Sequence, residues 1–354
     1  MSIRITGTGS CIPKIIKKNS DFLSNTFLNS DGTIFNVSND IIIKKFNSIT
    51  GIEERRYAKN DQNASDLAVI AAKNAIKDSK INPETLDYII VAHNFGDVKF
   101  GTKQSDSLPS LANRVKYNLG INNPDCVCYD LINGCPGWVE GVIQAQAYIK
   151  AGMAKKCLVI GTETLSRTYD INDRDSMIYS DGAGATIIEK KSKISNSGIL
   201  SHKSCSYSSE ETFYLFFGES YNSNNKSKEK YIKMYGHKIY EFAITHVPLA
   251  LKSCLDESGK SINDVKKVFL HQANEKMDEA IVSRFYKLFN LTPPSSVMPM
   301  SIRKLGNNSV ATIPTLYDLV KKNKLKNHKI KKGDIILFGS VGAGMNINAI
   351  TYQV

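Results

Sequence analysis

The sequence contains no apolar run that approaches the roughly 18 residues a membrane-spanning helix needs. Its first residues, 1–13, begin like a strand and contain no apolar stretch of the length found in a secretory signal. Cysteines are few and odd in number, seven in all, and their spacing matches no metal site. These absences predict a cytoplasmic protein with reduced thiols, no disulfide scaffold, no metal or redox cofactor and no membrane insertion.

Acidic residues are in the minority: 34 Asp plus Glu stand against 46 Lys plus Arg, a net charge of +12. Such an excess can attract nucleic acid, anionic lipid or an acidic protein. The basic residues are scattered except in 14–18 and 321–332, and neither stretch has interleaved aromatics or a nucleic-acid-binding motif. The charge favours a solvated basic surface, with an acidic protein partner as the alternative, and argues against nucleic acid.

The chain contains an internal duplication. Residues 66–81 have helical apolar spacing and precede a predicted strand at 88–94; residues 247–262 do the same before a strand at 268–274. A second pattern, an apolar strand followed by a Gly-Ala-Gly turn and another strand, also occurs twice, in 154–188 and 332–347. The 354 residues therefore read as one large duplicated unit.

Helices that alternate with short, continuously apolar strands predict sheets covered on both faces. Two such halves, 1–195 and 196–354, sharing a helix layer would form a duplicated five-layer α-β-α-β-α fold. The segment 201–235, rich in Ser, Asn and Tyr, interrupts the pattern and is predicted to be an inserted loop or cap. The segment 94–110 is the other long irregular piece, and long loops in compact domains are usually functional.

The residues around Cys135 have the pattern of a strand, a sharp turn and a buried helix. Gly134 permits the turn, Pro136 suits the first helical position, and the apolar spacing over 139–149 predicts a buried helix. Unpaired N–H groups and the helix dipole at this point would stabilise a thiolate and offer donors to an oxyanion. Such a cysteine is on its own more often a packing residue, so its assignment depends on other features.

Three features support a reactive cysteine. His271 follows the second-half strand at its carboxyl end, where α/β sheets place their sites, and its repeat equivalent is about Ala92. The turn 306–309 (Gly-Asn-Asn-Ser) offers a side-chain amide as a donor, and 342–344 (Gly-Ala-Gly) offers a closely approaching backbone. Each of them alone has an ordinary structural explanation.

Together, and in this order, the motifs resemble β-ketoacyl-acyl carrier protein synthase III. The motifs are Ile5-x-Gly7-x-Gly9-x-x-x-Pro13, Thr50-Gly51-Ile52-x-x-Arg55-Arg56, Asn133-Gly134-Cys135-x-Gly137, Asp181-Gly-Ala-Gly-Ala185, His271-Gln-Ala-Asn274 and Gly306-Asn307-x-Ser309. The resemblance extends from residue 3 to the C-terminus, and His-Gln-Ala-Asn with Gly-Asn-x-Ser downstream of a nucleophilic Cys is highly specific. It implies the thiolase fold, which is the five-layer architecture predicted above.

The resemblance implies that Cys135 attacks an acyl thioester and holds the acyl group. His271 and Asn307 would donate hydrogen bonds to the thioester carbonyl of malonyl-acyl carrier protein and so stabilise the enolate formed when carbon dioxide leaves. The enolate would attack the acyl-Cys to give a 3-oxoacyl product, and the backbone N–H groups of Cys135 and Ala343 would hold the oxyanion. This is a condensation of the fatty-acid initiation type, catalysed without a cofactor.

The resemblance also implies partners. It predicts a homodimer that pairs through the first-half sheet, with Leu108 near the position that reaches across the dimer to bound the acyl chain. Lys276 and Arg284 fall where the family presents cations to the acyl carrier protein. Asn274 is expected to orient or pack near His271.

Some positions depart from the family pattern. Lys45 and Ile49 occupy the places where fatty-acid-initiating members have an aromatic and an Arg that clamp the adenine of coenzyme A, and Pro136 and Trp138 replace a small residue and a Phe. The primer donor, coenzyme A or carrier protein, therefore stays open. One alternative is a specialised ketosynthase of dialkylresorcinol or polyketide-type metabolism that uses carrier-bound substrates.

Other thiolase-like activities remain as alternatives. A non-condensing acyltransferase of the same fold, or a non-catalytic partner subunit, would be expected to alter the Asn, the His or the nucleophile, and all three are present. Hydroxymethylglutaryl-type synthases need a catalytic Glu, which the sequence alone does not place.

Overall fold

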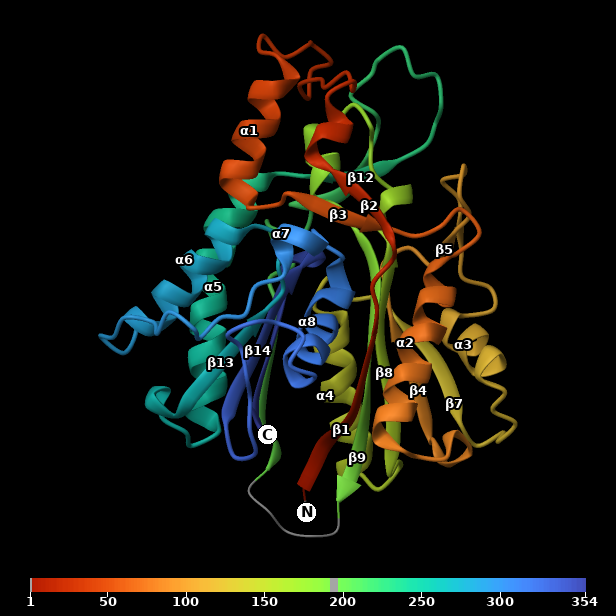
Figure 1. Ribbon diagram of the computed structural model, residues 1–354, viewed down its shortest axis with the longest axis vertical. Helices are drawn as coiled ribbons and strands as arrows, with labels where there is room; N and C mark the ends of the chain where they lie inside the picture. The colour runs from red at the N-terminus through yellow and green to blue at the C-terminus, as the bar shows by residue number, and fades with distance from the viewer. Residues whose placement is uncertain (1, 192–196) are drawn as a thin grey trace.

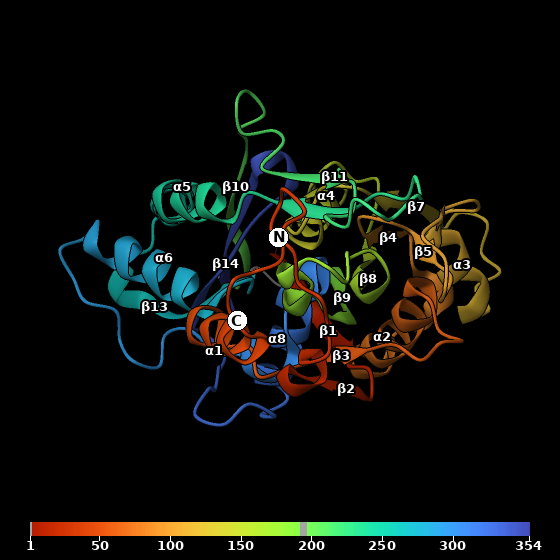
Figure 2. The same cartoon turned by 90° about the horizontal axis from the view of Figure 1, so that it is seen from above.

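The computed structural model describes residues 2–191 and 197–354, and these form five alternating layers, α-β-α-β-α (Figures 1 and 2). Helices α2 and α3 cover the outer face of one sheet, α4 and α8 lie between the two sheets, and α5 and α6 cover the other sheet. The bounds of these helices are α2 Ala64–Ser79, α3 Leu111–Leu119, α4 Gly137–Lys150, α5 Gly236–Glu257, α6 Glu275–Lys287 and α8 Thr312–Lys321.

The two sheets repeat one topology. The first has the order β1-β9-β8-β4-β7, and the second has the order β10-β15-β14-β13. In each sheet a parallel pair (β4 with β8, β13 with β14) is followed by an antiparallel neighbour (β9, β15). The strands are β1 Ser2–Cys11, β4 Tyr88–Ala92, β7 Val127–Leu131, β8 Lys156–Thr164, β9 Asp181–Lys191, β10 Gly198–Ser206, β13 Val265–Leu270, β14 Ile335–Gly342 and β15 Asn346–Gln353. The predicted five-layer, duplicated fold is confirmed.

The segment 201–235 is only partly the loop that the sequence predicted. Its first residues belong to β10, an edge strand of the second sheet whose register with β15 runs from Gly198↔Gln353 to Ser206↔Asn346. This strand could not be recognised from its composition, because an edge strand with one solvated face can be rich in Ser, Lys and His. The rest of the segment is a loop around a short hairpin, β11 (Leu215–Gly218) with β12 (Tyr231–Met234). The predicted boundary near residue 195 lies outside the described residues.

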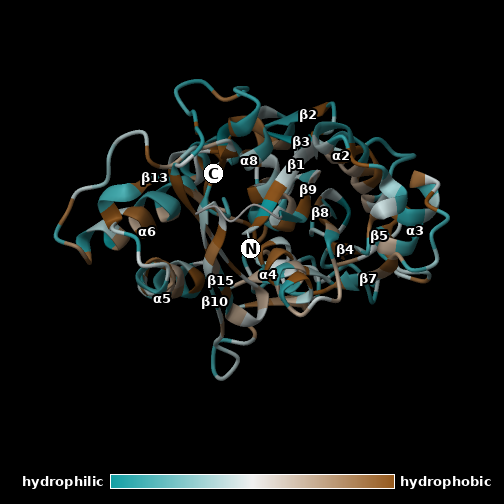
Figure 3. Cartoon of the chain, turned by 90° about the horizontal axis from the view of Figure 1, so that it is seen from below, coloured by the Kyte–Doolittle hydropathy of each residue, from teal (hydrophilic) through white to brown (hydrophobic). Residues whose placement is uncertain are grey.

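The layer between the sheets is held by packed aromatic rings. Trp138, in the first turn of α4, is 1% exposed, and its ring meets the ring of Phe338 on β14 edge-on with centroids 5.6 Å apart. Tyr317 also meets Phe338 edge-on, and Phe269 packs edge-on against Tyr317 and at a tilt against Phe338. The strands and inner helices carry most of the hydrophobic colour in Figure 3, and the outlying loops are mostly hydrophilic. Trp138 is thus a packing residue that fixes the start of α4, the helix that follows Cys135.

Shorter elements lie outside the five layers. They are β2 (Ile15–Lys18), β3 (Glu54–Tyr57), β5 (Asp97–Val98), β6 (Ser105–Asp106), α1 (Asn39–Thr50) and α7 (Ile302–Leu305). The irregular character predicted for 94–110 is confirmed, since β5 and β6 are its only regular residues among those described. Across the ranges 2–191 and 197–354, no helix is both long and apolar enough to cross a membrane.

Candidate active site

The carboxyl ends of the parallel strands gather the chemistry-bearing residues of both halves. Cys135 lies between β7 and α4, and His271 directly follows β13. The turn that carries Asn307 forms a parallel bridge with Tyr179 of the first half: the Asn307 N–H donates to Ile178 O (3.0 Å) and the Ser180 N–H donates to Asn307 O (2.8 Å). Residues from both halves are therefore locked side by side at one edge.

Two backbone segments touch directly beside Cys135. Gly134 has φ +60°, and a Cβ built on it would lie 2.7 Å from the backbone N of Ala343. A Cβ on Gly342 would lie 2.5 Å from the backbone N of Cys135, so glycine is required on both sides. Asn346 Nδ2 donates to Ala343 O (2.9 Å) and fixes the second segment. The two N–H groups expected to form the oxyanion hole are thus carried by adjoining segments.

The Cys135 thiol is more protected from ionisation than the sequence suggested. Helix α4 begins at Gly137, one residue later than predicted, with Pro136 at its N-cap. Burial raises the pKa of Cys135 to about 11, and a hydrogen bond from Ser309 Oγ to the sulfur (3.3 Å) acts in the lowering direction. The expectation that the helix start leaves a stabilised thiolate was wrong for the free protein, because the desolvation of a charged sulfur outweighs the nearby donors.

His271 is held as a neutral imidazole. It is 5% exposed, and burial lowers its pKa to about 4, although a hydrogen bond with the Ser309 backbone raises it. Its own backbone N–H donates to Gly339 O (2.9 Å) on the neighbouring strand β14. Within the described part of the chain its Nδ1 has no partner, an arrangement that costs free energy unless a ligand supplies one.

Asn307 has a fixed amide orientation. Its Oδ1 accepts the backbone N–H of Ser309 (2.8 Å), which turns the Nδ2 donor away from that amide. Gly306, with φ +62°, makes the turn possible, since a Cβ there would lie 2.9 Å from Cβ of the buried Arg55. Arg55 in turn donates through Nε and Nη2 to Met177 O (3.0 and 2.7 Å), which braces the segment that Asn307 bridges.

The sequence analysis missed two residues that lie behind the thiol. Asn94 follows β4 and Glu163 lies near the end of β8, so the parallel strands bring them to the same edge. Both the backbone N–H and Nδ2 of Asn94 donate to Glu163 Oε1 (2.7 and 2.5 Å), and Nδ2 also donates to Ser309 Oγ (3.0 Å). Burial raises the pKa of Glu163 to about 8. Their signal in the sequence was polar residues at the ends of two buried strands.

The remaining predicted residues lie at the surface. Leu108 is 89% exposed in the single chain. Lys276 and Arg284 are both exposed on α6, and the Arg284 Nη1 donates to Ile244 O (3.3 Å). Asn274 caps the same helix, since its Oδ1 accepts the Met277 N–H (3.1 Å), so its role near His271 is to fix the start of α6.

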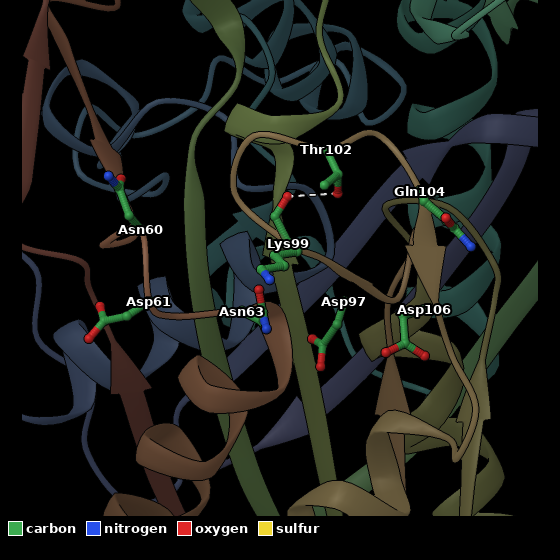
Figure 4. Close-up of a pocket in the computed structure, with 8 residues that line it drawn as sticks. All are labelled: Asn60, Asp61, Asn63, Asp97, Lys99, Thr102, Gln104 and Asp106. Atoms are coloured by element: carbon green, nitrogen blue, oxygen red, sulfur yellow. Dashed lines mark hydrogen bonds between the residues drawn. The ribbon is translucent and has the colours of Figure 1, made fainter.

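A polar pocket of about 470 Å³ lies between residues 60–63 and the 94–110 loop, and its lining includes none of Cys135, His271 and Asn307 (Figure 4). Its lining residues are Asn60, Asp61, Asn63, Asp97, Lys99, Thr102, Gln104 and Asp106. Asp97 is already bonded by Ser65 N and Oγ (2.8 and 2.6 Å) and by Arg114 Nη1 (2.8 Å). No group of three or more His, Cys, Asp or Glu suited to a metal occurs among the residues that the structure describes.

Two family models match the chain: 3-oxoacyl-[acyl-carrier-protein (ACP)] synthase III over residues 129–208, and its C-terminal counterpart over residues 255–354. The β-ketoacyl-[acyl-carrier-protein] synthase III of Porphyra purpurea is 30% identical over 100% of this chain and 99% of its own length. The chain belongs to the β-ketoacyl-[acyl-carrier-protein] synthase III family. The synthase III of Ehrlichia ruminantium, 33% identical over 97% of each chain, agrees.

Solved structures of synthase III enzymes share the whole fold. The enzyme from Aquifex aeolicus has a TM-score of 0.79 and 28% identity, over 99% of this chain and 100% of its own. A priming β-ketosynthase of the R1128 polyketide pathway, at 21% identity and a TM-score of 0.81, covers 100% of this chain and 96% of its own, and shows the fold alone. The resemblance to synthase III and the thiolase-like fold are both confirmed.

The raised pKa of Cys135 predicts slow thiol alkylation at neutral pH. Below a pKa of about 11 the thiolate fraction rises tenfold per pH unit, so the iodoacetamide rate at Cys135 should increase by about a thousandfold between pH 7 and pH 10. The measurement is the alkylated fraction of the Cys135-containing peptide by mass spectrometry. Cys135→Ala provides the blank, and a plateau reached by pH 8 would contradict the expected burial of the sulfur.

Proposed function

We propose that this chain catalyses the decarboxylative Claisen condensation of a Cys135-bound acyl primer with malonyl-acyl carrier protein, giving a 3-oxoacyl product of the fatty-acid initiation type. The observation that carries the proposal is that the three predicted catalytic side chains all meet Ser309. The Ser309 hydroxyl donates to Cys135 Sγ, its backbone N–H donates to Asn307 Oδ1, and its backbone is near enough to the His271 imidazole to raise the pKa of that ring against the effect of burial. A nucleophile and two neutral donor side chains around one point suit this two-stage reaction.

Cys135 performs the first stage. Its sulfur attacks the carbonyl of the acyl thioester, the new C–S bond forms, and the donor leaves as a thiol that carries the proton from Cys135. The negative charge on the tetrahedral intermediate would be held by the N–H groups of Cys135 and Ala343. The assignment of these two N–H groups is supported by the close packing of the backbone segments that carry them. This packing leaves both groups little freedom to reorient when charge develops.

His271 and Asn307 perform the second stage. Loss of carbon dioxide leaves its bonding electrons on the malonyl fragment, so an enolate forms without a base. Neutral donors at the thioester oxygen then lower its energy, and the low pKa of His271, about 4, keeps the imidazole neutral at physiological pH. The enolate carbon attacks the acyl carbonyl, the bond to Cys135 breaks, and its electron pair returns to the sulfur.

Three single substitutions separate the two stages. Cys135→Ala should form no acyl adduct with any donor, whereas His271→Ala and Asn307→Ala should still acquire the acyl group. Discharge of that adduct by malonyl-acyl carrier protein should be at least about a hundredfold slower in both, because each loses a donor to the enolate oxygen. Intact-protein mass spectrometry before and after malonyl-carrier addition gives both readings.

The exposed Asn118→Ala on α3 serves as the matched control and should behave as the parent chain does. An adduct on Cys135→Ala would remove the nucleophile assignment. Normal discharge from both His271→Ala and Asn307→Ala would instead favour transfer of the acyl group to another acceptor.

The donor of the primer is proposed to be a carrier protein. Lys45 and Ile49 are both exposed on α1 and provide neither the aromatic ring nor the guanidinium expected of an adenine clamp. Helix α6 packs beside α1, and its exposed Lys276 and Arg284 suit an acidic carrier; the ion pairs of the described residues include neither of them. This choice concerns only the thioester that delivers the primer, and it leaves the condensation of the fatty-acid initiation type unchanged.

Matched acyl-carrier-protein and acyl-coenzyme A donors distinguish these two routes. We expect the carrier donor to acylate Cys135 at least about tenfold faster, since a protein surface can contact both Lys276 and Arg284 on α6, whereas the adenine of coenzyme A meets no clamp at Lys45 and Ile49. Lys276→Glu should slow acylation from the carrier donor more than acylation from the coenzyme A donor. Turnover of acyl-coenzyme A at low micromolar concentration would contradict the assignment and restore the usual initiating route.

We also propose a homodimer formed through the first-half sheet. Strand β7 lies at the edge of that sheet, where β4 is its only partner among the described strands, and apolar side chains are exposed on and beside it: Val127 at 47% and Ile132 at 71%. An exposed edge of this kind is a ready site for pairing with a second copy. Leu108 would then bound the acyl chain of the partner rather than its own.

Sedimentation velocity should give about twice the 39.2 kDa chain mass, and Val127→Lys should shift the population toward the monomer. Leu249→Lys, which adds the same charge at a residue 50% exposed on α5, is the matched control. A parent chain that remains monomeric at micromolar concentration would exclude this assembly.

A further inference from the structure

A buried chain of polar side chains leads from Glu163 to the sulfur of Cys135. The family motifs contain Ser309 but neither Asn94 nor Glu163, and the two reaction stages described above assign no step to any of the three. The links are Glu163 to Asn94, Asn94 to Ser309, and Ser309 to Cys135, each with a hydrogen bond of 3.3 Å or less. The inference drawn from this chain of hydrogen bonds rests on the proposed role of Cys135 as the nucleophile.

Glu163 fixes the orientation of Asn94. The carboxyl is 1% exposed, and its Oε1 accepts both the backbone N–H and the side-chain N–H of Asn94. Above its pKa of about 8 the Glu163 carboxylate can only accept hydrogen bonds, so the opposite amide orientation would set the Asn94 oxygen against another acceptor oxygen. Asn94 is therefore held with Nδ2, a donor with two hydrogens, between Glu163 and Ser309.

The direction of the remaining bonds follows from this orientation. Asn94 Nδ2 donates to Ser309 Oγ (3.0 Å), so the serine oxygen is used as an acceptor on that side. A hydroxyl has one hydrogen, which is left to point at Cys135 Sγ, 3.3 Å away. Ser309 itself is fixed in a left-handed conformation, φ +50°, by its N–H bond to Asn307 Oδ1 (2.8 Å). The hydroxyl can therefore reorient little.

We propose that Asn94, oriented by Glu163, is a positioning residue that compels the Ser309 hydroxyl to donate its hydrogen to Cys135 Sγ. The bond stabilises negative charge on sulfur twice in each turnover: when Cys135 attacks the primer thioester, and when the condensed product leaves and its electron pair returns to the sulfur. Ser309 keeps its proton throughout. The proton of the thiol leaves with the donor thiol, and the released thiolate regains one from solvent.

The reactivity of Cys135 toward iodoacetamide tests this arrangement without any acyl donor. At pH 9 the alkylation of Cys135 in Ser309→Ala should be about tenfold slower, the value of one hydrogen bond to a charged sulfur. Asn94→Ala should also be slower, and the double variant Asn94→Ala/Ser309→Ala should be no slower than Ser309→Ala. The alkylated fraction of the Cys135 peptide is followed by mass spectrometry.

Two variants serve as controls. Ser340→Ala removes another buried hydroxyl, one without a partner among the described residues, and should leave the rate unchanged. Glu163→Gln keeps an oxygen acceptor for Asn94 and removes the negative charge that raises the pKa of Cys135, so its alkylation should be no slower than that of the parent chain. Thermal melting by circular dichroism confirms folding, and Asn94→Ser replaces Asn94→Ala should the latter not fold.

Two results would overturn the proposal. Alkylation of Ser309→Ala at the parent rate would mean that the hydroxyl does not stabilise the sulfur anion. An equal slowing by the Asn94 substitution in the presence and in the absence of the Ser309 hydroxyl would mean that Asn94 acts by another route. Failure of condensation with a normal alkylation pattern would count against the proposed function alone.

Discussion

The active centre depends on one backbone contact between the two halves, in which Gly134 and Cys135 lie against Gly342 and Ala343. The separation leaves no room for a Cβ at either glycine, so the position of the nucleophile is set by main chain and not by flexible side chains. The aromatic layer around Trp138 and Phe338 holds α4 and β14 at this distance. Cys135 is thus placed by two elements that are each anchored in the same central layer.

Burial shifts the pKa values of Cys135 and His271 in opposite directions. It makes Cys135 a weak acid and His271 a weak base, so neither charged form is present in quantity before a substrate arrives. The hydrogen-bond donors around the sulfur and around the Asn307 turn are nevertheless fixed in place. They stabilise the site only when negative charge develops during the reaction. Such an arrangement is typical of preorganised electrostatic catalysis, in which the cost of orientation is met during folding.

The sequence predicted the fold and the central residues of the site, for identifiable reasons. The duplication was visible because the apolar strands and the Gly-Ala-Gly turns recur at similar positions, and His271 was visible because its repeat equivalent, Ala92, has no functional group. Strand β10 was missed because an edge strand with a solvated face has the composition of a loop. Asn94 was missed because its contacts with Glu163 and Ser309 join distant parts of the chain, although its place at the end of a buried strand was visible in the sequence.

The pKa of Cys135 illustrates a further limit. A helix start is recognisable from Gly134 and Pro136, but the depth of the sulfur beneath the second half is a property of the assembled layers. The direction of the pKa shift depends on that depth, because desolvation and local donors act in opposite directions. Composition and motif therefore placed Cys135 at the start of a helix but did not show how deeply its sulfur is buried.

The hairpin β11–β12 is joined to the frame of the site by a buried ion cluster. Lys233 on β12 is 2% exposed and contacts Asp170 (2.8 Å) and Asp173 (3.0 Å), which belong to the segment leading to the Tyr179 bridge. Deleting the hairpin would leave the carboxylates of Asp170 and Asp173 buried without their cation. The loss of stability would be far larger than that from breaking an exposed ion pair. An exchange of this segment between relatives must therefore include Lys233, Asp170 and Asp173 together.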